Sequence, residues 1–278
     1  MSQSHNLQVH IGQMEEIRSI LNAMKNLAFI EIHKLSRFQT LQGMAVANIE
    51  AAAMDLLIFN PELAVEENHK QHVCIVVGSE RGFCGDFNET LIAGVKDENY
   101  SGIITIGNRL INRLLEINRP IAAEIAGASI AEEVPAVINQ LIETINTLPE
   151  VGKVKGLNLP DMRLTVVYHD FNAGRISQRP LFPPFQRQAT APFKHPPDLN
   201  LKPGELYADL VHQYLFAVLH EVFYNALVAE NHHRLQHLDG AVKHLDDETV
   251  TLRRKLQTFR QEEITEEIEV ILLNSENT

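Results

Sequence analysis

The chain has 278 residues, of which 45% are hydrophobic, and a formal net charge of −12 at pH 7. This length and composition provide enough apolar material for a buried core and argue against intrinsic disorder. The negative charge argues against a nucleic-acid partner, because binding to nucleic acid depends on neutralising phosphates. The two cysteines and a start without a secretory signal favour free thiols in a reducing compartment. No stretch approaches the roughly 20 apolar residues of a transmembrane helix, which leaves docking onto a membrane complex open.

A long helix is expected over residues 7–59. The segment contains no proline and only two glycines, and its apolar residues recur every three or four positions, which is the periodicity of one helical face. Asn60 and Pro61 then end the pattern. The apolar stripe contains Leu7, Ile11, Met14, Ile17, Leu21, Met24, Leu27, Leu35, Phe38 and Leu41.

The middle of the chain, about residues 70–200, alternates short apolar runs with amphipathic ones. This alternation predicts a mainly parallel, Rossmann-like α/β sheet. Prolines between residues 183 and 197 then mark an irregular stretch. We expect strands at 72–78, 102–107, 121–125, 162–168 and 175–181, and helices at 87–95, from 108 through 117, and at 130–148.

A second long helix is expected over residues 205–272. Helices of roughly 50 and 65 residues would be about 75 and 100 Å long, and such lengths favour a coiled coil. Because the two helices come from opposite ends of the chain, we expect an antiparallel pair in which Leu21 and Phe259 lie close enough to crosslink. The spacing does not follow a strict heptad, which predicts a supercoil that is weak or changes along its length. The second stripe includes Leu238, Leu245, Leu252, Leu256, Phe259, Ile264, Ile268 and Ile271.

These patterns predict an α/β central domain with long N- and C-terminal helices that form an antiparallel coiled coil. The expected parts are an N-terminal coiled-coil helix (1–60), the α/β domain (70–200) and a C-terminal coiled-coil helix (205–273).

The segment 78–88 lies where a strand is expected to end and a helix to begin, a common place for phosphate binding. It lacks the Gly-Lys-Ser/Thr ending of a phosphate-binding loop, and its glycines do not fit the dinucleotide fingerprint. A structural turn is therefore favoured over a nucleotide site. Cys84 lies in this turn and is a possible nucleophile, but no partner histidine is identifiable, so a small buried residue is the favoured interpretation.

Histidines are frequent, and His233 and His237 share a face of the second long helix. A zinc site needs a third ligand, and none is identifiable, so we interpret them as polar residues on a coiled-coil surface. The sequence thus predicts no catalytic, cofactor-binding or metal-binding residues.

Two segments nevertheless resemble the gamma subunit of F-type ATP synthases. Residues 79–88 are similar to that family's Ser-Asp-Arg-Gly-Leu-Cys-Gly-Gly-Phe-Asn, and residues 260–268 to its C-terminal Arg-Gln-x-x-Ile-Thr-x-Glu-Ile. Residues 230–235 also match its Glu-x-x-x-Arg-Met pattern. The residues of the first motif that match are Arg81, Gly82, Cys84, Gly85, Phe87 and Asn88.

The N-terminal helix resembles the family less closely. Ala23 and Met24 match it, but Ile17, Ser19, Ile20 and Leu21 stand where many gamma chains have a Thr-x-Lys-Ile-Thr run. These departures indicate a divergent branch, such as the proton- or sodium-linked ATPases that accompany the usual synthase.

The resemblance implies a central rotor shaft that performs no chemistry and needs no cofactor. Its implied partners are a catalytic ring of alpha and beta subunits, the epsilon subunit and a membrane rotor ring, at the cytoplasmic face of a bacterial inner membrane. It also implies that Arg260, Gln261, Thr265 and Glu267 contact the catalytic ring. Two other hypotheses stay open: a cofactor-dependent α/β enzyme with helical extensions, which a nucleotide bound at 78–88 would support, and a coiled-coil scaffold unrelated to rotation.

Overall fold

Both long helices are present in the computed structural model of the chain. Helix α1 spans Gln3–Phe59 and helix α5 spans Pro203–Glu276. The structure describes residues 3–64, 71–95, 100–147, 152–153, 160–185 and 196–276. Two compact units are present: residues 1–29 with 234–278, which we call the tip unit, and residues 30–233, which we call the base unit. The predicted division into an N-terminal helix (1–60), an α/β domain (70–200) and a C-terminal helix (205–273) stays a prediction.

The base unit contains a five-stranded sheet with the strand order β3-β2-β1-β6-β7. Strands β3, β2, β1 and β6 pair in parallel, and β7 pairs antiparallel with β6. The strands are β1 (His72–Val77), β2 (Gly102–Ile106), β3 (Ala123–Ile125), β6 (Arg163–Asp170) and β7 (Arg175–Phe182). A two-stranded ribbon of β4 (Gly152–Lys153) and β5 (Pro160–Asp161) is separate. The mainly parallel α/β sheet predicted from the sequence is confirmed.

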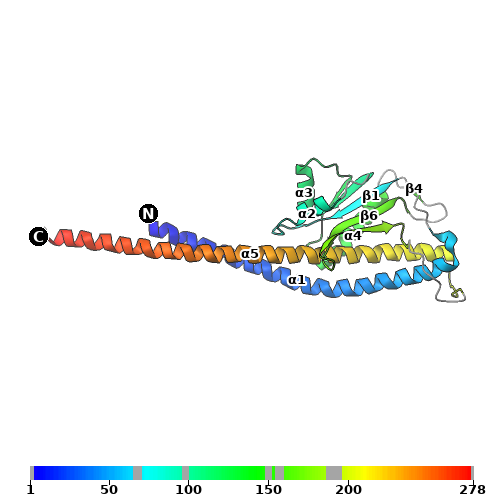
Figure 1. Ribbon diagram of the computed structural model, residues 1–278, viewed down its shortest axis with the longest axis horizontal. Helices are drawn as coiled ribbons and strands as arrows, with labels where there is room; N and C mark the ends of the chain where they lie inside the picture. Colours follow the sequence, from blue (N-terminus) through cyan, green and yellow to red (C-terminus); the bar gives the residue numbers. More distant parts are fainter. Residues whose placement is uncertain are drawn as a thin grey trace. The chain divides into compact units, whose positions relative to one another are not determined.

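Helices cover both faces of this sheet (Figure 1). On one face, α2 (Phe87–Gly94) and α3 (Asn108–Glu116) pack on Cys74, Val76 and Val167. On the other face, α4 (Val134–Thr147) and the base-unit parts of α1 and α5 form the main core. Because helices cover both faces, the last five residues of β1 are all buried, as expected for a central parallel strand. Short 3₁₀ turns, η1 (Pro61–Leu63) and η2 (Ala131–Glu133), follow α1 and precede α4.

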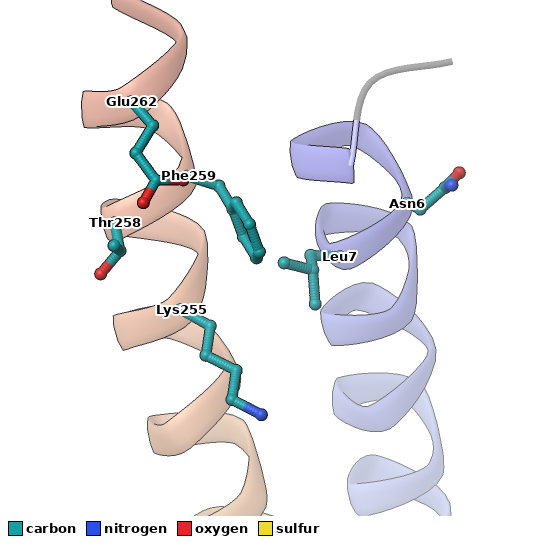
Figure 2. Close-up of a pocket in the computed structure, with 6 residues that line it drawn as sticks. All are labelled: Asn6, Leu7, Lys255, Thr258, Phe259 and Glu262. Carbon is teal, nitrogen blue, oxygen red and sulfur yellow. The ribbon is translucent and has the colours of Figure 1, made fainter. Parts of the chain in front are cut away.

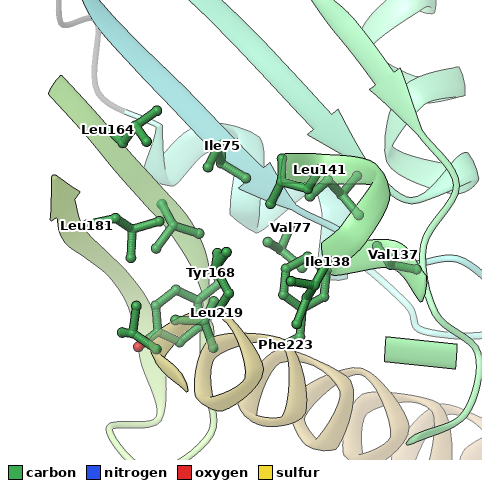
Figure 3. Packing of buried hydrophobic residues seen from close by; sticks show 14 of the residues in the cluster. Ile75, Val77, Val137, Ile138, Leu141, Leu164, Tyr168, Leu181, Leu219 and Phe223 are labelled. Atoms are coloured by element: carbon green, nitrogen blue, oxygen red, sulfur yellow. The ribbon is translucent and has the colours of Figure 1, made fainter. Parts of the chain in front are cut away.

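Helix α5 contributes much of the main core. Figure 3 shows Leu219 and Phe223 of α5 beneath strand residues such as Ile75 and beside Ile138 of α4. Buried apolar area contributes about 25 cal/mol per Å² to folding, so this interface holds α5 firmly to the sheet.

The tip unit pairs the first 27 described residues of α1 with the C-terminal part of α5, and its seam follows a heptad. Along α5, the least exposed positions recur at alternating intervals of four and three residues, which is the heptad spacing of a left-handed coiled coil. The apolar residues of the sequence do not follow a strict heptad, but these seam positions do, and the predicted supercoil stays a prediction. These seam positions are Leu238, Val242, Leu245, Thr249, Leu252, Leu256, Phe259 and Glu263.

Several residues of the predicted stripes lie outside the seam. Ile17 and Leu27 of α1 are 48% and 65% exposed, and Ile264, Ile268 and Ile271 of α5 are all more than half exposed. Sequence periodicity counted every apolar residue, whereas the seam includes Thr249 and Glu263. The predicted stripes are thus wider than the surface that the two helices bury against each other.

The two helices of the tip unit run antiparallel, as predicted, but the expected register is wrong. Leu21 packs against Leu238 and Val242, and Leu7 faces Phe259 (Figure 2). Ion pairs between the helices agree with this register: Arg18 with Asp246, Lys25 with Asp239, and Glu15 with Arg253.

The expectation that no segment is apolar enough to span a membrane also needs correction. One stretch of 18 residues within Ser4–Phe59 passes that test by length and composition alone. Core helices and signal sequences pass the same test, so this is weak support for a membrane span.

We expect the register to be visible by disulfide crosslinking. Because Leu7 and Phe259 face each other, the Leu7→Cys, Phe259→Cys variant should form an intramolecular disulfide on mild oxidation. The Leu21→Cys, Phe259→Cys variant should not, since Leu21 packs against Leu238 and Val242, about five helical turns away from Phe259. The natural cysteines are buried and stay in both variants. A disulfide in the second variant alone, seen as a mobility shift on a non-reducing gel, would contradict the register.

Candidate functional site

The first motif forms a closed turn between β1 and α2. Ser79 donates its backbone N–H to Asn88 Oδ1 at 3.1 Å, and Asn88 Nδ2 donates to Ser79 Oγ at 2.8 Å. This reciprocal pair of hydrogen bonds holds the end of the strand against the first turn of the helix. Asn88, one of the motif residues, therefore acts structurally, as a side-chain substitute for backbone pairing.

Two glycines of this turn are required by geometry. A Cβ at Gly78 would lie 2.5 Å from Leu110 Cβ, so a side chain there would displace α3. Gly85 has φ +61°, a left-handed conformation that glycine adopts without strain. Gly82, by contrast, has ordinary space around it. Phe83 also has a positive φ, +63°, which is uncommon for a bulky residue and places strain at the tip of the turn.

Glu80 occupies the donors that could otherwise bind an anion at this edge of the sheet. Its carboxylate accepts hydrogen bonds from the Asn108 backbone N–H at 3.0 Å and from the Gly127 N–H at 2.7 Å. Asn108 is the first residue of α3, where the helix dipole favours negative charge. The chain thus supplies its own carboxylate at a position where related folds often hold a ligand phosphate.

Arg81 joins the first motif to the segment 230–235. Its backbone N–H points to Glu230 Oε1 of α5 at 3.4 Å, and its Nε donates to Ser129 Oγ at 2.9 Å. Glu230 belongs to the segment 230–235 and is 3% exposed. Two of the three resembling segments therefore meet in space, although 149 residues separate Arg81 from Glu230.

Cys84 and Phe87 fill the space between the turn and α5. Both are buried and pack with Ala229, and Cys84 Sγ lies 3.4 Å from the Gly82 carbonyl oxygen. The thiol also lies 3.5 Å from the Arg81 carbonyl oxygen, so both contacts are to backbone of the same turn. The interpretation of Cys84 as a small buried residue is supported by this environment.

A pair of histidines lies against Phe87. The His169 ring stacks on Phe87 with centroids 3.9 Å apart, and its Nε2 lies 2.7 Å from the Phe87 carbonyl oxygen. His233 packs edge-on to the same Phe87 ring. Burial lowers the pKa of both histidines below the usual value, and for His169 the hydrogen bond to Phe87 partly opposes this. The interpretation of His233 as a plain surface residue is wrong, because it is half-buried in this cluster.

The C-terminal candidates lie on the tip unit and are all exposed. Arg260 donates from Nη2 to Gln8 Oε1 of α1 at 3.2 Å, and Thr265 Oγ1 donates to the Gln261 carbonyl oxygen of its own helix at 2.8 Å. Glu267 points to solvent. Beside them, an open groove of about 570 Å³ runs between the helices (Figure 2). Its lining residues are Asn6, Leu7, Lys255, Thr258, Phe259 and Glu262.

Sequence reasoning missed Glu80, Ser129 and Glu230 as members of one site. Glu80 was part of the resembling segment, but the family there has Asp, and nothing local predicted which amides it would meet. Within the described ranges, no group of three or more His, Cys, Asp or Glu side chains is placed to hold a metal ion. The absence of cofactor and metal residues stays a prediction.

Comparisons with known proteins agree on one family. The family model described as ATP synthase matches residues 3–274. The chain is 25% identical to the ATP synthase gamma chain of Clostridium beijerinckii over 276 residues, covering 94% of this chain and 93% of that one. It is 26% identical to the ATP synthase gamma chain of Clostridium botulinum over 281 residues, covering 96% and 95%.

A solved structure has the same fold. The chain resembles one from the central stalk and c-ring of the Tetrahymena thermophila mitochondrial ATP synthase, with a TM-score of 0.58 and 14% identity. The match covers 80% of this chain and 99% of that one.

The histidine pair predicts acid sensitivity of the base unit. Since the folded pKa of His169 lies below the unfolded value of about 6.5, the unfolded state binds more protons as the pH falls through that value. Stability should therefore decrease as the pH falls through about 6.5 and level off below the folded pKa of His169. The His169→Gln variant should show a shallower fall in Tm by calorimetry over that range. An exposed control, His244→Gln, should keep the wild-type slope; a wild-type slope in His169→Gln would contradict the assignment.

Proposed function

This chain belongs to the ATP synthase gamma-chain family, and on that premise we propose that it is a non-catalytic torque shaft. It is the central-stalk subunit of an ATP synthase complex that is associated with a membrane. In this role, the tip unit turns inside a catalytic ring of alpha and beta subunits. The α/β domain, with an epsilon subunit, seats the shaft on a membrane rotor ring at the cytoplasmic face of a bacterial inner membrane.

One observation supports this proposal most strongly: the helix pair buries a narrow seam and leaves many large apolar residues exposed. Ile20 and Leu27 of α1 are at least 60% exposed in the tip unit, as is Ile271 of α5. Large exposed apolar surfaces are typical of protein interfaces. A surrounding ring of alpha and beta subunits would cover these side chains, whereas an isolated coiled coil would leave them in water.

The polar residues near the C-terminus provide directional hydrogen-bonding groups on this surface. Arg260, Gln261, Thr265 and Glu267 offer donors and acceptors on an exposed helix. Contacts that form at some angles of rotation and not at others would favour particular states of the ring, which is how differential binding shifts an equilibrium. The open groove beside Phe259 gives the same region an asymmetric shape.

Two features of the base unit argue against the enzyme alternative. Glu80 occupies the amides that would hold a phosphate, and the Cys84 thiol lies against carbonyl oxygens. We therefore expect the purified chain alone to hydrolyse no ATP. A coupled-enzyme assay that gave about one turnover per second or more, in a preparation freed of contaminants by a second affinity step, would support the enzyme alternative instead.

We expect the tip residues to control turnover of the complex. Removing the Arg260 and Gln261 side chains should leave folding unchanged, since exposed substitutions usually change stability by less than about 0.5 kcal/mol. Each charge-assisted hydrogen bond contributes about 1.5 to 3 kcal/mol, so the Arg260→Ala, Gln261→Ala variant should lower ATP turnover of the assembled complex several-fold.

Gln8→Ala provides the control for this experiment. It removes the intramolecular partner of Arg260 but keeps the guanidinium. Turnover near the wild-type level in Gln8→Ala, with a several-fold loss in the double variant, would locate the effect in contacts with the ring. Unchanged turnover in an intact double-variant complex would mean that these residues are a solvated helix face.

A further inference from the structure

Near the ends of the base unit, α1 is bonded to the loop between β3 and α4, and α5 is bonded to the turn between β1 and α2. On α1, that unit begins at residue 30, and Glu31 and Lys34 follow at once. On α5, it ends at residue 233, and Glu230 lies one turn before that end. All three side chains are directed at loops at the carboxyl ends of the parallel strands.

The contacts of α1 go to the loop between β3 and α4, residues 126–133. Glu31 Oε1 accepts a hydrogen bond from the Ala131 backbone N–H at 2.8 Å, in a partly buried position. Lys34 Nζ forms an ion pair with Glu132. Because Glu132 is 60% exposed, this ion pair contributes little in water, and Glu31 is the more important member.

The same loop is bound from its other side by the first motif. Gly127 donates its N–H to Glu80, and Ser129 accepts from Arg81 Nε. The Arg81 backbone N–H in turn points to Glu230 of α5. A continuous chain of hydrogen bonds therefore leads from α1, through two loops, to α5. We call its six members the collar: Glu31, Lys34, Arg81, Ser129, Glu132 and Glu230.

We propose that the collar is the joint that fixes α1 rotationally to the α/β domain, with Glu31 as its positioning residue. The inference rests on the proposed shaft function. Apolar packing of residues such as Leu35 and Leu56 already holds α1 in the main core. Hydrogen bonds have preferred angles, so they resist turning. Farther along α1, polar contacts also join Gln42 to α5 and Glu50 to β7, and of these three residues Glu31 lies nearest to the end of the unit.

Three variants separate this role from a general structural one. Glu31→Ala removes the acceptor, and Glu31→Gln removes the charge but keeps an acceptor oxygen. Arg37→Ala is the control, since Arg37 is exposed on the same helix. Amide hydrogen exchange at Ala131 first reports whether the bond is broken. We expect faster exchange only in Glu31→Ala; equal exchange in all three variants would overturn the proposal.

The decisive measurement uses the whole complex with its catalytic ring immobilised. A probe attached at Asn112→Cys, exposed on α3, reports the angular fluctuation of the α/β domain while the shaft is stalled without ATP. We expect the variance to rise about twofold or more in Glu31→Ala, and to return near the wild-type value in Glu31→Gln because Gln keeps an oxygen that can accept from the Ala131 N–H.

The outcomes separate the two proposals. If the wild-type chain does not assemble with a catalytic ring, the proposed function fails. If all complexes assemble and turn but the variance is the same in Glu31→Ala and wild type, the collar is not a rotational joint. A lower Tm of Glu31→Ala with unchanged variance would likewise overturn the proposal, since it would leave only a role in stability.

Discussion

Burial of one face of α5 against the sheet determines how the rest of the base unit is arranged. Tyr207, Val211, Val218 and Val222 of this helix are fully buried, together with α4 and the apolar face of the sheet. Helix α5 covers this face of the sheet together with α4 and part of α1, which belong to the same core. Helices α2 and α3 cover the opposite face of the sheet. The turn between β1 and α2 then lies beside α5, where Phe87 meets Ala229 and Arg81 meets Glu230.

Under the proposed function, the two resembling segments of the base unit have a mechanical rather than a chemical role. The turn has the location of a phosphate site, but Glu80 caps α3 and the Gly127 amide with the chain's own carboxylate. A rigid turn whose amides are paired within the chain suits a part that transmits force, since no ligand has to bind or leave. The exposed apolar residues of the tip unit have the complementary property, because they need a partner to cover them.

The sequence predicted the sheet well, because central parallel strands have continuous apolar runs, such as residues 73–77, and turn signals separate them. It predicted the helix seam less well for a physical reason. Residues such as Ile17 and Leu27 are apolar without facing the other helix, and Thr249 occupies a seam position without being apolar. The register depends on pairwise contacts, such as Leu21 with Leu238, which periodicity alone does not contain.

The residues of the candidate site also differ in whether the sequence could predict them. Asn88 and Gly85 could be found from the motif, because side-chain clips and left-handed turns need particular residues. Glu31 could not, since its partner is a backbone amide 100 residues away that no residue type marks. The histidine pair was also missed, because His169 lies in a strand and His233 in a helix, and only the fold places both against Phe87.

The claim that this chain is a rotating shaft is tested most directly by watching it turn. The purified complex would be immobilised through its catalytic ring, and a gold particle attached to the α/β domain at Asn112→Cys would be followed by dark-field microscopy. With ATP, the account predicts sustained rotation in one direction that stops when ATP is removed. A complex that hydrolyses ATP while the particle only fluctuates about a fixed angle would contradict it.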